Sequence, residues 1–158
     1  MHPLRCALAL LFLALLGFAM HVAADTAPSP GSPAAVVQSL YRACLDHSTG
    51  FNAESVKLAK PWVAPDLYAR ILKKLNQPTP KGEAPDIEGD IFLDAQEPPS
   101  SFTVRETTSD LGAVSVEVIL KWPHEKRRYY VLVLQIDGVW KVIDVNYGKD
   151  GTLRNLLK

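Results

Sequence analysis

Residues 131–145 read VLVLQIDGVWKVIDV, and this stretch decides the fold class. Apolar residues fill both of its halves, and Asp137-Gly138 stands between them as a dipeptide typical of a two-residue hairpin turn. We therefore predict two antiparallel strands, from Arg128 to Asp137 and from Val139 to Tyr147.

Two more strands are expected before this hairpin, from Phe102 to Thr108 and from Ala113 to Trp122. Turn signals separate them at Ser109-Asp110 and at residues 123–125. In the third strand both faces are apolar, one with Tyr130, Leu132, Leu134 and Ile136, the other with Val131 and Val133. The middle of the sheet is therefore expected to be covered on both sides or to curl around a pocket.

The chain before the strands has the periodicity of helices. Ser32 as N-cap and Pro33 at the first helical position open a helix that should end near Asp46. A second helix is expected from Pro65 to about Asn76, with short helical turns over residues 54–60 and 152–157. Helices followed by a meander predict an α+β fold, with N-terminal helices packed on one face of a curved, four-stranded antiparallel sheet.

The first 24 residues have the order of a secretory signal peptide. Arg5 precedes an uncharged run over residues 7–20, and small residues follow up to Ala24. Because the apolar run is shorter than the ~20 residues of a membrane-spanning helix, we expect cleavage after Ala24, export to the periplasm or medium, and no stable membrane anchor. Residues 25–33 are expected to be a flexible leader, and residues 34–158 a single α+β domain.

The charge balance and the cysteines exclude several classes of protein. The chain has 17 Lys and Arg residues against 17 Asp and Glu residues, which argues against a nucleic-acid partner. Lys126-Arg127-Arg128 is interpreted as a solubility cluster at a hairpin end, not as a phosphate site. After cleavage only Cys44 remains, on a helical stripe with Val37 and Leu40, and we predict that it is buried and inert.

No metal or cofactor is expected. His47 and His124 are far apart and form no zinc spacing with Cys44, and residues 86–90 lack the spacing of a calcium loop. The chain also has no Gly-x-Ser-x-Gly motif of a serine hydrolase.

The composition changes between Gln77 and Pro99. This segment contains five prolines and six carboxylates, and no basic residue lies between Lys81 and Arg105. We expect Ile91-Phe92-Leu93 to pin the segment to the core. An uncompensated negative field steers a basic partner, so the partner-facing residues are predicted to be Glu83, Asp86 and Glu88.

Three stretches carry a resemblance to a known family: VAPDLYAR at 63–70, DIFLDAQE at 90–97 and GVWKVIDV at 138–145. With them, most of residues 34–157 resembles a family of short secreted bacterial proteins catalogued as domain of unknown function 3828. The last of these stretches is also similar to domains like nuclear transport factor 2. This resemblance implies a cystatin-like or nuclear transport factor 2-like cone, in which helices pack on a curved sheet. The resemblance implies a pocket between helices and sheet, and no particular activity.

An enzyme of this fold would need a buried acid, His or Tyr with a shifted pKa. The pocket or loop candidates are Asp94, Gln96, Tyr41, Tyr68, Asp144 and Tyr147, with His47 as a further titratable residue. Asp144 is placed on the face of the last strand that carries Trp140 and Val142, and is interpreted as a structural carboxylate. No residue is assigned as catalytic.

Two classes of function follow. One is an exported binding or interaction module for an unknown small molecule or protein, including an inhibitor that neutralises a toxin. The other is a small isomerase or lyase that uses the cone pocket. The lack of a His and Asp pair at a suggestive spacing favours the binding module.

Overall fold

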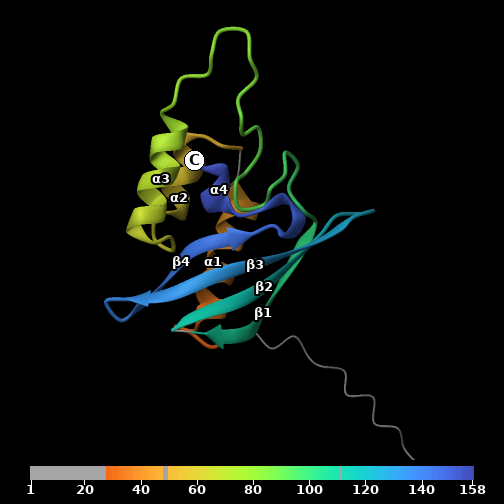
Figure 1. Cartoon of the computed structure of the whole chain (residues 1–158). Coiled ribbons are helices and arrows are strands. Elements are labelled where there is room, and N and C mark those ends of the chain that lie inside the picture. Colours follow the sequence, from red (N-terminus) through yellow and green to blue (C-terminus); the bar gives the residue numbers. More distant parts are fainter. Residues whose placement is uncertain (1–27, 48–49, 111) are drawn as a thin grey trace, which may run out of the picture.

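The computed structural model describes residues 28–47, 50–110 and 112–158 (Figure 1). The predicted signal peptide and residues 25–27 of the predicted leader therefore lie outside the described residues, whereas residues 28–33 of that leader are described. The fold is α+β, as predicted. It contains, in order, α1 (Pro33–His47), α2 (Ala53–Ala59), α3 (Pro65–Leu75), β1 (Ser101–Asp110), β2 (Ala113–Lys121), β3 (Lys126–Ile136), β4 (Val139–Asn146), the 3₁₀ turn η1 (Gly148–Asp150) and α4 (Leu153–Leu156). The strands form one antiparallel meander in the order β1-β2-β3-β4.

Two local features explain where α1 begins and where the last hairpin turns. The Ser32 hydroxyl accepts a hydrogen bond from the Ala35 N–H at 3.1 Å, which confirms the predicted cap of α1. The last hairpin turns at Asp137 and Gly138, whose φ angles of 50° and 79° fit the predicted two-residue turn. The turn predicted at Ser109-Asp110 is wrong, because both residues still pair with β2.

The core lies between α1 and one face of the sheet. Val131 and Val133 of β3 are fully buried there, beside Val116 and Val118 of β2. The opposite face of β3, with Tyr130, Leu132 and Leu134, is only half-buried. The Val131 face is therefore the one that the core covers, although both faces of β3 are apolar.

The segment before α3 pairs with the free side of β4. The Ala64 N–H donates to the Val142 carbonyl, and the Val142 N–H donates to the Trp62 carbonyl, each at 2.8 Å. Val63 thus forms a parallel bridge with β4. This pairing ties α2 and α3 to the end of the sheet where the β3–β4 hairpin turns.

The proline-rich segment after α3 rises away from the body and returns to it before β1 (Figure 1). Ile91, Phe92 and Leu93 are only 4%, 2% and 1% exposed, which confirms the predicted anchor. They belong to the same core cluster as Tyr41, Tyr129 and Tyr147. None of the helices in the described ranges is long and apolar enough to cross a bilayer.

Candidate functional site

Residues 89–96, which we call the anchored loop, are closed at their base by backbone contacts. The Asp90 N–H donates to the Ala95 carbonyl at 2.9 Å. A Cβ atom on Gly89 would lie 2.3 Å from that same carbonyl oxygen, so only glycine fits at this position. The buried Asp90 carboxylate accepts the N–H groups of Phe92 and Leu93 at 2.8 and 2.9 Å, which shapes the turn that enters the core.

Side chains from the sheet hold the anchored loop from the other side. The Tyr147 hydroxyl donates to the Ile91 carbonyl. Arg127 Nη1 donates to the Asp94 carbonyl at 2.6 Å, and the Tyr129 hydroxyl lies 3.3 Å from Asp94 Oδ2. Asp94 has a φ of 48°, a left-handed conformation that persists only where neighbours fix it. The exposed Asp94 carboxylate is thus held in one position at the surface.

Three tyrosines lie behind the anchored loop. The rings of Tyr129 and Tyr147 meet edge to face with 5.2 Å between their centroids. Burial raises the pKa of Tyr129 to about 12 and raises the pKa of Tyr41 and Tyr147 well above their usual values. All three phenols are therefore neutral near pH 7. The Tyr41 hydroxyl is buried and has no hydrogen-bond partner among the described residues.

Cys44 lies next to this cluster and is 7% exposed, as predicted for a core residue. Burial raises the pKa of its thiol, and the nearby Asp90 carboxylate raises that pKa further. The thiolate form is therefore disfavoured, which is the chemistry of an unreactive cysteine.

Four of the predicted site residues come together in this region. They are Asp94 and Gln96 on the anchored loop and Tyr41 and Tyr147 behind it. Tyr68 does not join them: it lies on α3, with Lys60 Nζ 5.8 Å from the centre of its ring.

Asp144 is also outside this group, and its predicted strand face is wrong. Asp144 pairs with Leu132 whereas Val142 pairs with Val133, so Ile143 is the extra residue of a β-bulge that turns Asp144 away from the Val142 face. Asp144 Oδ1 accepts the N–H of Arg154 at 3.0 Å. Its role is structural, as interpreted from the sequence, because it holds the start of α4.

Arg127 and Tyr129 are site residues that the sequence analysis missed. Arg127 was grouped with its basic neighbours, yet it pairs with Glu125 at 2.5 Å and lies 5.0 Å from the Trp122 ring. The alternation of Tyr129 with the buried Val131 was a usable signal, because it places the phenol on the core face.

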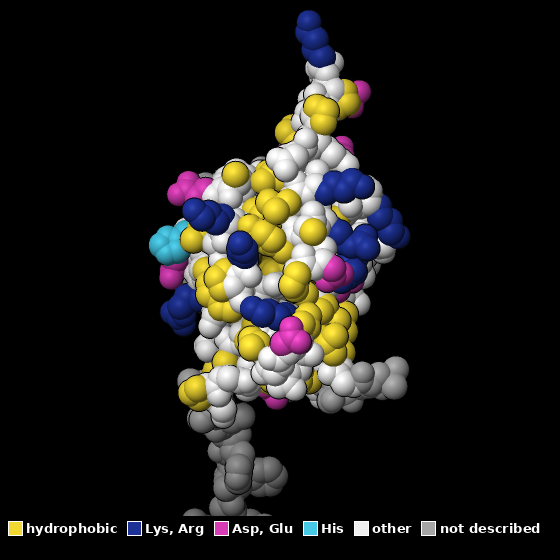
Figure 2. All heavy atoms as spheres, turned by 90° about the vertical axis from the view of Figure 1, so that its left-hand side faces the viewer, with side chains coloured by type: hydrophobic (Ala, Val, Ile, Leu, Met, Phe, Trp, Pro, Cys, Tyr) yellow, Lys and Arg dark blue, Asp and Glu magenta, His cyan; other side chains and the backbone are white. Residues whose placement is uncertain are grey.

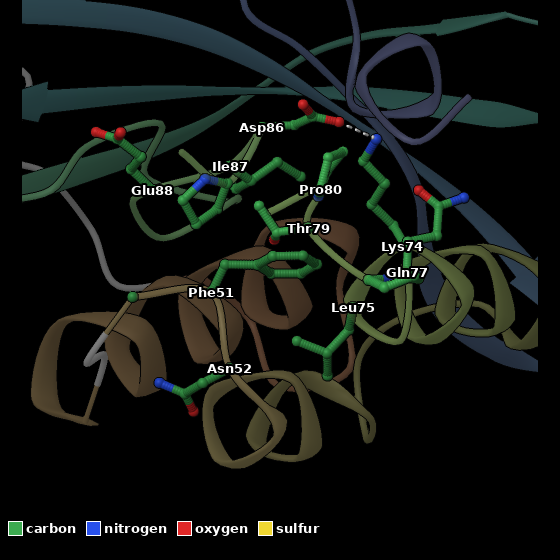
Figure 3. Close-up of a pocket in the computed structure, with 13 residues that line it drawn as sticks. Phe51, Asn52, Lys74, Leu75, Gln77, Thr79, Pro80, Asp86, Ile87 and Glu88 are labelled. Carbon is green, nitrogen blue, oxygen red and sulfur yellow. Dashed lines mark hydrogen bonds and ion pairs between the residues drawn. The ribbon is translucent and has the colours of Figure 1, made fainter. Parts of the chain in front are cut away.

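Open hollows follow one another along residues 77–97. The first has a volume of about 580 Å³ and lies between Phe51, the end of α3 and the proline-rich segment (Figure 3). Phe51, Thr79 and Ile87 point into it, whereas Asn52 and Glu88 point away. The second hollow, about 300 Å³, shares its residues 86–88 with the first.

A third hollow, of about 370 Å³, continues the row. It shares Asp94 and Arg127 with the second hollow, and Tyr129 and Tyr147 also line it. The anchored loop therefore lies beside the second and third of three neighbouring open hollows.

The negative charge of the acidic segment is partly neutralised by a cation, contrary to what its composition predicted. Lys74 of α3 pairs with Asp86 at 2.8 Å. The segment itself contains no cation after Lys81, but the fold brings one to it from another element. Gln96 Nε2 donates to Glu88 at 2.6 Å. Glu83, Asp86 and Glu88 are all exposed, and their predicted role in facing a partner stays a prediction.

Within the described ranges, His, Cys, Asp and Glu side chains form no group of three that could hold a metal ion. Comparison of the chain with protein-family models, curated proteins and solved structures found no match. The resemblance to domain of unknown function 3828 and to nuclear transport factor 2 therefore stays an expectation.

Proposed function

We propose that the protein is an exported interaction module that binds an extended segment of a partner protein along the row of hollows beside residues 77–97. The observation that carries this proposal is that the three hollows are neighbours, because the first and second share residues 86–88 and the second and third share Asp94 and Arg127. A small-molecule site is usually one concave pocket that encloses most of its ligand. A row of open hollows suits an extended chain better.

The side chains that line the hollows indicate which residues the partner segment would carry. Phe51, Leu75 and Ile87 offer an apolar wall to a hydrophobic side chain in the first hollow. The second hollow is lined by four carboxylates and one cation, Arg127, which favours a Lys or Arg side chain there. The third hollow is lined by three acids and three cations. The anchored loop is held in place before binding, which lowers the ordering cost of association. An inhibitor that neutralises a basic toxin is one specific case.

An isomerase or lyase is the second candidate, and one observation favours it. The neutral Tyr129 phenol and the Asp94 carboxylate, 3.3 Å apart, both line the third hollow, where a phenol can donate a proton to a bound substrate. The other two buried tyrosines do not help, because Tyr41 is fully enclosed and the Tyr147 hydroxyl is already bound to the anchored loop.

Export is proposed from residues 1–24 alone. Protein recovered from the periplasm or medium should have an intact mass that starts at Asp25. Recovery of the uncleaved chain, or of a lipid-modified chain, in membranes would contradict export with cleavage.

Affinity capture from the native organism tests the interaction itself. We compare the unmodified chain with a variant carrying Glu83→Gln, Asp86→Asn and Glu88→Gln. A matched control carries Asp46→Asn, Glu54→Gln and Asp137→Asn, which remove the same charge from exposed positions outside the row. Loss of the captured protein and of its salt dependence in the first variant alone supports the proposal. Equal capture by all three chains means that this row is not the interface.

A further inference from the structure

Charge is distributed unevenly along the chain, and α2 with α3 carries the basic part. Residues 53–75 contain five cations, Lys57, Lys60, Arg70, Lys73 and Lys74, against the two acids Glu54 and Asp66. Residues 83–97 contain six acids and no cation. The zero net charge of the whole chain therefore hides a local excess of positive charge on these helices.

Ion pairs neutralise one of the two acids and one of the five cations of this region, which leaves four cations against the single acid Glu54. Asp66 pairs with Arg154 at 2.7 Å, and Lys74 pairs with Asp86 at 2.8 Å. The four other cations, Lys57, Lys60, Arg70 and Lys73, are exposed and make no ion pair within the described part of the chain. We call these four residues the basic face.

The basic face surrounds apolar side chains. Figure 2 looks at this side of the molecule and shows Lys and Arg side chains around hydrophobic ones. Tyr68, half-buried, lies under Lys60 Nζ. Arg70, Lys73 and Lys158 line a hollow of about 460 Å³ together with the apolar Ala69 and Leu157. The one acid that lines it, Asp66, is the partner of Arg154.

The tip of the β3–β4 hairpin adds an exposed apolar residue next to this region. Val139 is 52% exposed, the largest value among the large hydrophobic residues that the structure describes. Lys141 Nζ donates to the Pro61 carbonyl, and Val142 pairs with Val63, so the hairpin lies against the connection between α2 and α3.

We propose that the basic face docks on a bilayer surface rich in anionic phospholipid. Cations attract anionic headgroups, and aromatic and aliphatic side chains between them enter the interface. A nucleic acid would also bind the four cations, but it would not explain why the apolar side chain of Val139 is exposed beside them. An acidic protein would have to match cations spread over two helices. This inference does not depend on the proposed partner of the hollows, which uses other residues.

Vesicle co-sedimentation tests the proposal with the full chain. The probes are phosphatidylcholine vesicles, with and without phosphatidylglycerol, at low and physiological salt. Binding to phosphatidylcholine alone gives the charge-independent background, to which the apolar run of residues 7–20 contributes equally in every variant. We expect added binding to the anionic vesicles that falls as salt rises.

Two matched variants separate docking from general charge. One changes Lys57, Lys60, Arg70 and Lys73 to Gln, and the control changes four other exposed lysines, Lys81, Lys121, Lys126 and Lys149, to Gln. The first should lose almost three orders of magnitude in affinity for the anionic vesicles, since each of the four cations near such a surface raises that affinity roughly fivefold. The control should bind within about twofold of the unmodified chain, because distant charges are screened.

Three outcomes would overturn the proposal. The control variant could lose as much binding as the first, which would mean non-specific attraction. Inorganic phosphate or duplex DNA could compete fully with the vesicles, which would mean an anion or nucleic-acid site. Val139→Ser could leave vesicle binding unchanged, whereas insertion of this side chain predicts a loss of about threefold or more.

Discussion

Two tyrosines of the same core should respond in opposite ways to the same chemical change. Tyr41 is fully buried and its hydroxyl has no partner among the described residues, whereas Tyr147 is 7% exposed and donates to the Ile91 carbonyl. Replacement of either residue by Phe removes one hydroxyl and keeps the ring. We expect Tyr41→Phe to stabilise the protein and Tyr147→Phe to destabilise it.

The magnitudes follow from what each hydroxyl leaves behind. Tyr147→Phe exposes no new surface but leaves the Ile91 carbonyl without its donor, and an unsatisfied buried group costs about 1–3 kcal/mol. Tyr41→Phe removes a polar group that is buried without compensation, which should raise the free energy of unfolding by about 1 kcal/mol. The packing of Tyr41 against Phe102, with ring centroids 6.0 Å apart, does not need the hydroxyl.

Urea unfolding of the two variants and the unmodified protein measures this difference. The dependence of the unfolding free energy on urea concentration should be equal in all three, which confirms that only stability has changed. The variants should differ by about 2–4 kcal/mol. If Tyr41→Phe is as destabilising as Tyr147→Phe, the Tyr41 hydroxyl has a partner such as a bound water. The premise that this hydroxyl is buried without compensation would then be refuted.

Three further predictions concern the same region. Cys44 should resist alkylation in the native protein and react after denaturation, as peptide mass spectrometry of labelled chains would show; rapid native labelling would contradict its burial. Gly89→Ala should lower the free energy of unfolding in urea by about 2–3 kcal/mol, because the new Cβ meets the Ala95 backbone; an effect below about 0.5 kcal/mol would show that the loop base yields easily. The Tyr129 pKa of about 12 lies above the value of ~10 for an unfolded chain, so its contribution to stability is complete below pH 10 and is lost as the pH rises towards 12. Urea unfolding at a series of alkaline pH values should show a smaller loss of stability for Tyr129→Phe than for the unmodified protein, and parallel curves would refute this assignment.

The sequence by itself determined the elements and the class of fold. The cap at Ser32, the hairpin at Asp137-Gly138 and the burial of Cys44 were all predicted correctly. Each depends on interactions within a few residues, or on a periodicity that one element displays alone. The anchor at residues 91–93 was also predictable, because bulky apolar residues inside a polar segment must be buried somewhere.

Only the tertiary structure decided how the site is assembled. Arg127 and Tyr129 reach Asp94 from more than 30 positions away, and Lys74 reaches Asp86 from another element. These contacts depend on strand register and on how the loop packs, and residue order along the chain carries no direct signal for either. A single bulge at Ile143 was enough to move Asp144 to the other face of β4, because one inserted residue inverts every side chain beyond it.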